Sequence, residues 1–198
     1  MSWKTIVITP PQFCERECEK ICRLIDSGVN YIHLRHPEAD IEEFRNILEG
    51  LPERYHPHIR LHSHFGLVNE FPIGGLHLNR RWPLAELKST PLSKSCHSIE
   101  ELKENDGQGY EYLTLSPIYD SISKEGYKAA FSSEDLSGIG TFTTPVMALG
   151  GIKPEHFHFL KGIGFRGAAL LGAIWQGDFD RNLDALIGGI EALGKEGV

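Results

Sequence analysis

Histidine, arginine and serine side chains gather at the ends of four short apolar segments in the first half of the chain. In chain order they are His33, Arg35, His62, Arg80, Ser95 and His97. Histidine exchanges a proton near neutral pH because its unperturbed pKa is about 6.5, whereas arginine and serine donate hydrogen bonds to anions. These residue types predict a site for an anionic molecule, with Arg35 and Ser95 among its ligands. His33, His62 and Arg80 are further candidates for anion contacts.

The segment around Ser95 separates its side chains onto two faces. Successive side chains of a β-strand point to opposite sides, so Ser95 and His97 share one face and Cys96 takes the other. If Ser95 faces the site, His97 faces it too, and Cys96 packs against the covering layer. His97 is therefore the candidate for proton transfer. The alternative for the strand histidines is a structural contact with a neighbouring backbone group.

Two glycine-containing turns, Gly150-Gly151 and Leu171-Gly172, follow apolar segments in the last quarter of the chain. Glycine lacks a Cβ, so backbone amides at such turns can approach a phosphate group closely. We interpret both turns as phosphate-binding. The alternative is that they are tight turns and nothing more.

A long polar loop, residues 117–130, precedes the first of these turns. Its hydroxyl and ammonium groups at Ser121, Ser123 and Lys124 are suited to a lid or clamp over a phosphate. A solvated surface loop is the alternative interpretation.

Short strands and helices must alternate to position these residues. Eight apolar segments are predicted as strands, at 5–8, 29–34, 59–62, 75–78, 92–97, 112–115, 145–149 and 167–171. Helical patterns lie between most of them, including helices at 13–27 and 179–193, a short one at 84–88, and one that Ser98 and Glu101 open with a capping box. Eight such units predict an α/β fold, a (β/α)8 barrel whose strands carry the site at their C-terminal ends. The rival open sheet usually has a G-x-G-x-x-G turn after its first strand, which residues 9–12 lack.

Composition agrees with one globular domain spanning residues 1–198. Hydrophobic residues make up 40% and charged residues 24% of the 198, and the formal net charge of −7 argues against a nucleic-acid partner. No apolar stretch approaches the roughly 18 residues of a membrane helix, so no membrane partner is expected. The N-terminus has no secretory pattern, and we expect a cytoplasmic protein. The sequence leaves the oligomeric state open, a homo-oligomer included.

Four motifs, taken in order, resemble the thiamine phosphate synthase/TenI family. They are S-C-H-S at 95–98, L-S-P-I-Y-D-S-I-S-K at 115–124, A-L-G-G-I at 148–152 and G-A-A-L-L-G-A-I at 167–174. The resemblance extends from I-H-L-R at 32–35 to the final helix. It implies a (β/α)8 barrel that acts on a small-molecule thiazole phosphate in thiamine biosynthesis.

By this resemblance, the chain keeps the family's thiazole phosphate motifs and lacks its acidic metal positions. Synthases of this family join thiazole phosphate to a pyrimidine methyl diphosphate and release diphosphate with help from Mg²⁺. Their pattern has Q-x-R-x-K after the second strand, N-D after the third and a glycine–glutamine–acidic run after the fourth. This sequence has His62-Ser63 and Asn79-Arg80-Arg81 at the last two places, so both acidic metal positions are absent. We expect no cofactor, and Mg²⁺ only if the chain is a synthase.

The retained thiazole phosphate motifs favour the TenI branch of the family, whose members are similar to thiazole tautomerases. By that resemblance His97 moves a proton so that the thiazole carboxylate phosphate becomes aromatic. One alternative is a thiamine phosphate synthase (thiamine-phosphate pyrophosphorylase) in which Arg80 and Arg81 contact the anion directly. A non-catalytic regulator that binds thiazole or thiamine phosphate is another. A metal-dependent hydrolase is a third alternative, because His62-Ser63-His64 has the H-x-H form of a metal site.

Overall fold

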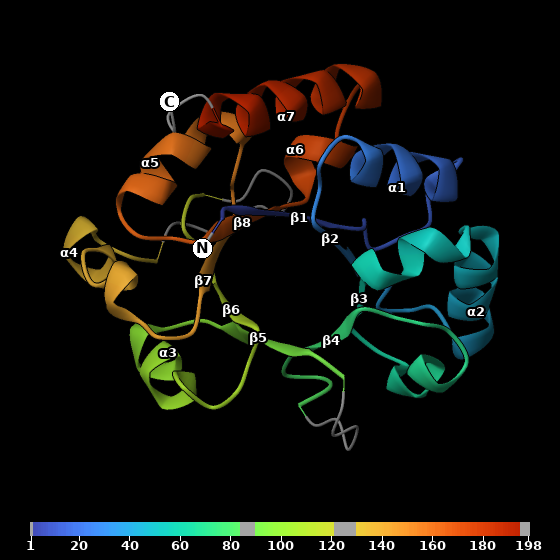
Figure 1. Ribbon diagram of the computed structural model, residues 1–198, viewed down its shortest axis with the longest axis horizontal. Helices are drawn as coiled ribbons and strands as arrows, with labels where there is room; N and C mark the ends of the chain where they lie inside the picture. Colours follow the sequence, from blue (N-terminus) through green and yellow to red (C-terminus); the bar gives the residue numbers. More distant parts are fainter. Residues whose placement is uncertain (1, 84–89, 121–129, 195–198) are drawn as a thin grey trace.

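Eight parallel strands close into a barrel in the computed structural model, which describes residues 2–83, 90–120 and 130–194 (Figure 1). The strands are β1 Lys4–Ile8, β2 Tyr31–Leu34, β3 Ile59–Leu61, β4 Gly75–Leu78, β5 Leu92–Cys96, β6 Tyr112–Leu115, β7 Val146–Leu149 and β8 Gly167–Leu170. Neighbours in sequence are neighbours in the sheet, and β8 pairs with β1 to close it. The predicted (β/α)8 barrel is confirmed, with all eight strands at their predicted positions.

Helices surround the barrel on its outside (Figure 1). The α-helices are α1 Glu17–Asp26, α2 Ile41–Gly50, α3 Ile99–Asn105, α4 Ser133–Leu136, α5 Phe157–Gly162, α6 Gly172–Trp175 and α7 Phe179–Gly194. Short 3-10 helices are η1 Glu53–His58, η2 Phe65–Asn69, η3 Ile139–Thr141 and η4 Pro154–His156. None of the helices in these described segments is long and apolar enough to cross a membrane. The short helix predicted at 84–88 lies outside the described residues.

One helix start and one helix cap differ from the sequence prediction for local reasons. Helix α1 begins at Glu17 rather than near residue 13, and the Glu17 carboxylate accepts a hydrogen bond from the Cys14 backbone N–H at 2.9 Å. Before α3, Ser98 accepts from the Glu101 backbone N–H at 3.1 Å, as predicted. The Glu101 carboxylate accepts instead from the His97 N–H, at 2.6 Å. That bond ties the His97 backbone to the first turn of α3.

The barrel has two cores, one outside the sheet and one inside it. The larger core packs sheet residues such as Val7, Leu61 and Cys96 against the helices, and Cys96 is fully buried there. Inside the barrel, Ile6, Ile8, Met147 and Ala169 pack together with Tyr112. Apolar residues of β1, β7 and β8 therefore fill one side of the interior. The other side, formed by β2 to β5, is polar.

Candidate active site at the barrel mouth

A cavity of about 540 Å³ opens at the C-terminal ends of the strands. Its lining includes residues predicted for the site from four different strand ends: Arg35, Ser95, His97, Gly150, Gly151, Leu171 and Gly172. Closure of the barrel brings these positions into one pocket although they span most of the sequence. The cavity also exposes parts of His33, His62 and Arg80.

The turns after β7 and β8 form one wall of this cavity. Gly150 and Gly151 have positive φ angles of 96° and 64°, which residues with a side chain rarely adopt. A Cβ on Gly151 would lie 2.2 Å from the Asp120 carbonyl oxygen, so the chain after β6 passes directly over this glycine. Glycine is thus required for the shape of this wall, and the phosphate contact expected there stays a prediction.

Arginines form the opposite rim. Arg35 follows β2 and is partly buried, and its burial lowers the pKa of its guanidinium group. Arg80 and Arg81 follow β4 and are exposed; Arg81 donates to the Pro37 carbonyl oxygen at 2.9 Å. Three cations around one mouth favour an anionic ligand, and the anion site expected from the residue types stays a prediction.

His97 lies at the exposed rim, just beyond the end of β5. Its Nδ1 is 3.3 Å from the Ser116 hydroxyl and 3.4 Å from the Ser116 carbonyl oxygen. The imidazole therefore borders the cavity and is oriented by the end of β6, with its ring accessible to a bound molecule. This position is compatible with the predicted proton transfer.

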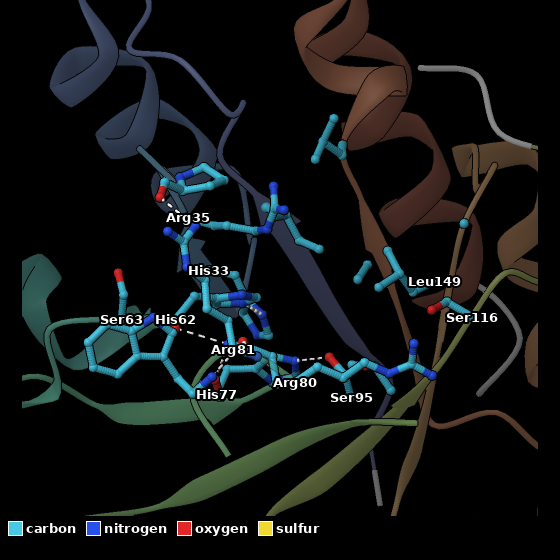
Figure 2. Close-up of a pocket in the computed structure, with 18 of the residues that line it drawn as sticks. His33, Arg35, His62, Ser63, His77, Arg80, Arg81, Ser95, Ser116 and Leu149 are labelled. Atoms are coloured by element: carbon cyan, nitrogen blue, oxygen red, sulfur yellow. Dashed lines mark hydrogen bonds between the residues drawn. The ribbon is translucent and has the colours of Figure 1, made fainter. Parts of the chain in front are cut away.

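Three histidine rings form the floor of the cavity. Figure 2 shows His33, His62 and His77 side by side, from β2, the residue after β3, and β4. His33 Nδ1 lies 2.8 Å from His62 Nε2, and His33 Nε2 lies 2.7 Å from the Tyr112 hydroxyl. His77 Nδ1 and Nε2 each lie 2.8 Å from a serine hydroxyl, Ser93 and Ser95 respectively.

Burial keeps these rings neutral. Desolvation lowers the pKa of His33 and of His62 well below 6.5, and neighbouring histidine rings lower both further. Desolvation also lowers the pKa of His77 to about 3. Both nitrogens of His33 already have partners, which leaves it no N–H for an anion. Because a neutral imidazole carries no positive charge to attract an anion, electrostatics does not favour the anion contacts predicted for His33 and His62.

The remaining residues from the sequence analysis are His64 and three residues of the loop after β6. His64 does not pair with His62: its Nε2 is 3.0 Å from the Ala39 carbonyl oxygen, and its ring packs against Phe44 and Trp82. The H-x-H pair suggested for a hydrolase therefore does not form. Ser121, Ser123 and Lys124 lie outside the described residues, so their predicted phosphate contacts stay predictions.

Sequence reasoning missed the role of His77 in the floor. Ser95 points into the barrel, on the face opposite Cys96 as strand alternation predicted, and its hydroxyl lies 2.8 Å from His77 Nε2. The available signal was a histidine at an inward position on β2 and on β4, with a third directly after β3. This histidine pattern predicts a cluster only once the barrel is known, because neighbouring strands of the barrel bring the three rings together.

The lining does not suit Mg²⁺. Magnesium prefers hard oxygen ligands, usually carboxylates, and no Asp or Glu belongs to the described residues that line the cavity. Arg35, Arg80 and Arg81 would repel the ion. The magnesium expected for a synthase therefore has no ligand set in this part of the chain.

A closed parallel barrel with its cavity at the C-terminal ends of the strands defines the class of (β/α)8 barrel proteins. The family described as thiamine monophosphate synthase matches residues 5–174. The chain belongs to this family of thiamine biosynthesis.

Individual relatives agree over most of the chain. It is 25% identical over 166 residues to the thiamine-phosphate synthase of Syntrophomonas wolfei, covering 79% of each sequence. It is 26% identical over 170 residues to that of Bacteroides fragilis, covering 77% of this chain and 82% of the relative. The crystal structure of thiamine phosphate pyrophosphorylase from Bacteroides thetaiotaomicron superposes with a TM-score of 0.83 at 32% identity, covering 98% and 99% of the chains.

Proposed function

We propose that this protein is a thiamine-phosphate synthase that uses arginines where its relatives' pattern has acidic metal ligands. The observation that carries the proposal is the single mouth cavity, with glycine turns on one wall and three arginines on the other. The reported relatives, all named for the synthase reaction, favour this alternative over the tautomerase interpretation. The cavity of about 540 Å³ is of the size that small-molecule sites have.

The arginines can stabilise the diphosphate leaving group of the synthase reaction. The thiazole nitrogen forms a bond to the pyrimidine methylene carbon, the bond from that carbon to the diphosphate oxygen breaks, and diphosphate leaves with the electron pair. Guanidinium groups bind such oxygens with charge-assisted hydrogen bonds and stabilise the charge that develops on them. Arg35 and Arg80 would contact the diphosphate, while the glycine turns bind the thiazole phosphate.

The test is an assay with both substrates, in EDTA and in Mg²⁺, that measures thiamine phosphate by mass spectrometry. We expect product in EDTA, because no carboxylate cluster among the described lining residues calls for magnesium. Arg35→Gln should raise KM for the diphosphate substrate at least tenfold. Arg166→Gln, which changes an exposed arginine before β8 at the opposite end of the barrel, is the matched control. Absence of product under both conditions would refute the proposal.

Thiazole tautomerisation is the second candidate, favoured by the placement of His97. A proton-transferring residue must border the substrate, and the exposed His97 ring lies at the cavity rim beside Ser116. The synthase reaction removes no proton from the thiazole nitrogen, whereas tautomerisation requires proton transfer. His97→Ala should therefore abolish tautomerisation but leave most synthase turnover.

The two candidates are separated by incubating the protein with the thiazole carboxylate phosphate tautomer. Formation of the aromatic product, followed by NMR and lost in His97→Ala, would support the tautomerase. Binding of thiazole phosphate without turnover in either assay would instead indicate the regulator named in the sequence analysis. A thermal shift with ligand measures that binding directly.

A further inference from the structure

We propose that His33, His62 and His77 form a binding site for a divalent transition metal ion such as Zn²⁺. One nitrogen from each ring lies within 4.8 Å of one nitrogen from each of the others. No other group of this kind, with three or more histidine, cysteine or acidic residues, occurs in the described segments. The proposal is independent of which reaction the mouth catalyses.

The separations of the rings suit three ligands on one side of an ion. The ring centroids are 4.9 Å apart for His33 and His62, 4.6 Å for His33 and His77, and 4.4 Å for His62 and His77. With a zinc–nitrogen bond of about 2.1 Å and a centroid about 1.1 Å behind the nitrogen, two ligands at the tetrahedral angle have centroids about 5.2 Å apart. The rings must therefore move apart by less than about 1 Å, and the stacked rings of His62 and His77, whose planes differ by 28°, must rotate to direct their nitrogens at a common point.

The outer nitrogens of His33 and His77 already have the partners that metal-bound histidines require. A ligating histidine usually hydrogen-bonds through its other nitrogen, which fixes the tautomer and the ring orientation. His33 has Tyr112 at 2.7 Å for this purpose. His77 has Ser93 at 2.8 Å, and Ser93 donates its own proton to the Leu76 carbonyl oxygen, so it accepts from His77 Nδ1. A lone pair is then left on His77 Nε2, directed toward Ser95 and the cavity.

Metal binding would replace two hydrogen bonds in the floor. The ion would take the place of the contact between His33 Nδ1 and His62 Nε2 and of the contact between His77 Nε2 and Ser95. No proton needs to leave the protein. The hydrogen bond between His33 and His62 places a proton on one of the two facing nitrogens, and that ring must shift the proton to its outer nitrogen so that both facing nitrogens can bind the ion. The remaining coordination position would face the cavity, which all three rings line.

The ligand set selects the class of ion. Three imidazoles without a carboxylate suit Zn²⁺, Co²⁺ or Ni²⁺, whereas Mg²⁺ prefers oxygen ligands. The same site that would bind zinc should therefore ignore magnesium at equal concentration.

The test is a calorimetric titration of chelator-treated full-length protein with ZnCl₂, and separately with MgCl₂. We expect one Zn²⁺ per chain and no response to Mg²⁺. His62→Gln should weaken zinc binding at least tenfold. His64→Gln is the matched control, because it changes a histidine two residues away that bonds to Ala39 instead. Its affinity should equal that of the wild type.

Two further measurements keep the proposal falsifiable if His62→Gln does not fold. Ser93→Ala keeps all three ligands but removes an outer partner, and should weaken zinc binding about tenfold. Wild-type protein with Co²⁺ should show the weak visible bands of nitrogen ligation without a thiolate charge-transfer band, which excludes Cys14, Cys18 and Cys22 as ligands. No zinc binding by the wild type, equal binding by His62→Gln or Ser93→Ala, or a thiolate band would each overturn the proposal.

Discussion

The buried histidines should make the metal-free protein lose stability in mild acid. In the unfolded chain each histidine takes up a proton below a pKa of about 6.5. In the folded protein desolvation lowers the pKa of His77 to about 3 and that of His33 and His62 well below 6.5. The unfolded state therefore binds more protons over this range, and stability falls as the pH decreases.

The size of the effect follows from these values. Stability is fully present above pH 6.5 and is lost progressively as the pH falls toward the folded-state pKa. Each protonating group contributes about 1.4 kcal/mol per pH unit, so His77 alone removes roughly 3 kcal/mol between pH 6.5 and pH 4. His33 and His62 act in the same direction. A loss of this size is a large part of the 5–15 kcal/mol that holds a typical domain folded.

Urea unfolding in EDTA at several pH values between 7 and 4 measures this loss. In His77→Gln the dependence of the unfolding free energy on pH should be less steep by about 1.4 kcal/mol per unit. Ser93→Ala removes a partner of the same ring but keeps the ring itself. It should lower stability at every pH while leaving the slope unchanged. An unchanged slope in His77→Gln would refute the argument that this ring is held neutral by burial.

Two other predictions concern the frame of the site. Gly151→Ala should destabilise the protein by at least about 2 kcal/mol in thermal or urea unfolding, because its φ is positive and its Cβ would meet a carbonyl oxygen at 2.2 Å; Gly162→Ala, with open space around it, should not. Arg60→Met should destabilise by about 2 kcal/mol, because Arg60 is buried and pairs with Glu111 at 3.1 Å. Arg45→Met, which breaks exposed ion pairs on α2, should change stability by less than about 1 kcal/mol. Equal effects in either pair would contradict the structural explanation.

The barrel could be predicted because each strand is a short apolar segment separated from the next by helical spacing. Alternation alone placed Ser95 and Cys96 on opposite faces of β5, and the structure shows that Ser95 lies inside and Cys96 against the helices. The start of α1 could not be predicted in this way, because an apolar pattern does not show that the Glu17 carboxylate binds the Cys14 N–H. Element boundaries depend on such single contacts, whereas element type depends on the whole segment.

The histidine floor depends on information that a local pattern lacks. His33, His62 and His77 meet because three neighbouring strands lie side by side. The register pairs Leu61 with Leu76, so His62 and His77 follow as neighbours, and it pairs His33 with Arg60, two residues before His62. Conversely, His62 and His64 look like a metal pair in sequence, yet His64 has a φ of 51° and turns toward Ala39. The spacing of His62 and His64 within one segment suggested a pair that does not form. The cluster that does form brings together histidines from three separate segments.

A crystal structure with thiazole phosphate bound would test the placement of the substrate most directly. We predict electron density for the phosphate against the turns at Gly150-Gly151 and Leu171-Gly172, with the ring directed toward His97. Density for the phosphate on Arg80 and Arg81, with the glycine wall empty, would contradict the assignment of the two halves of the cavity.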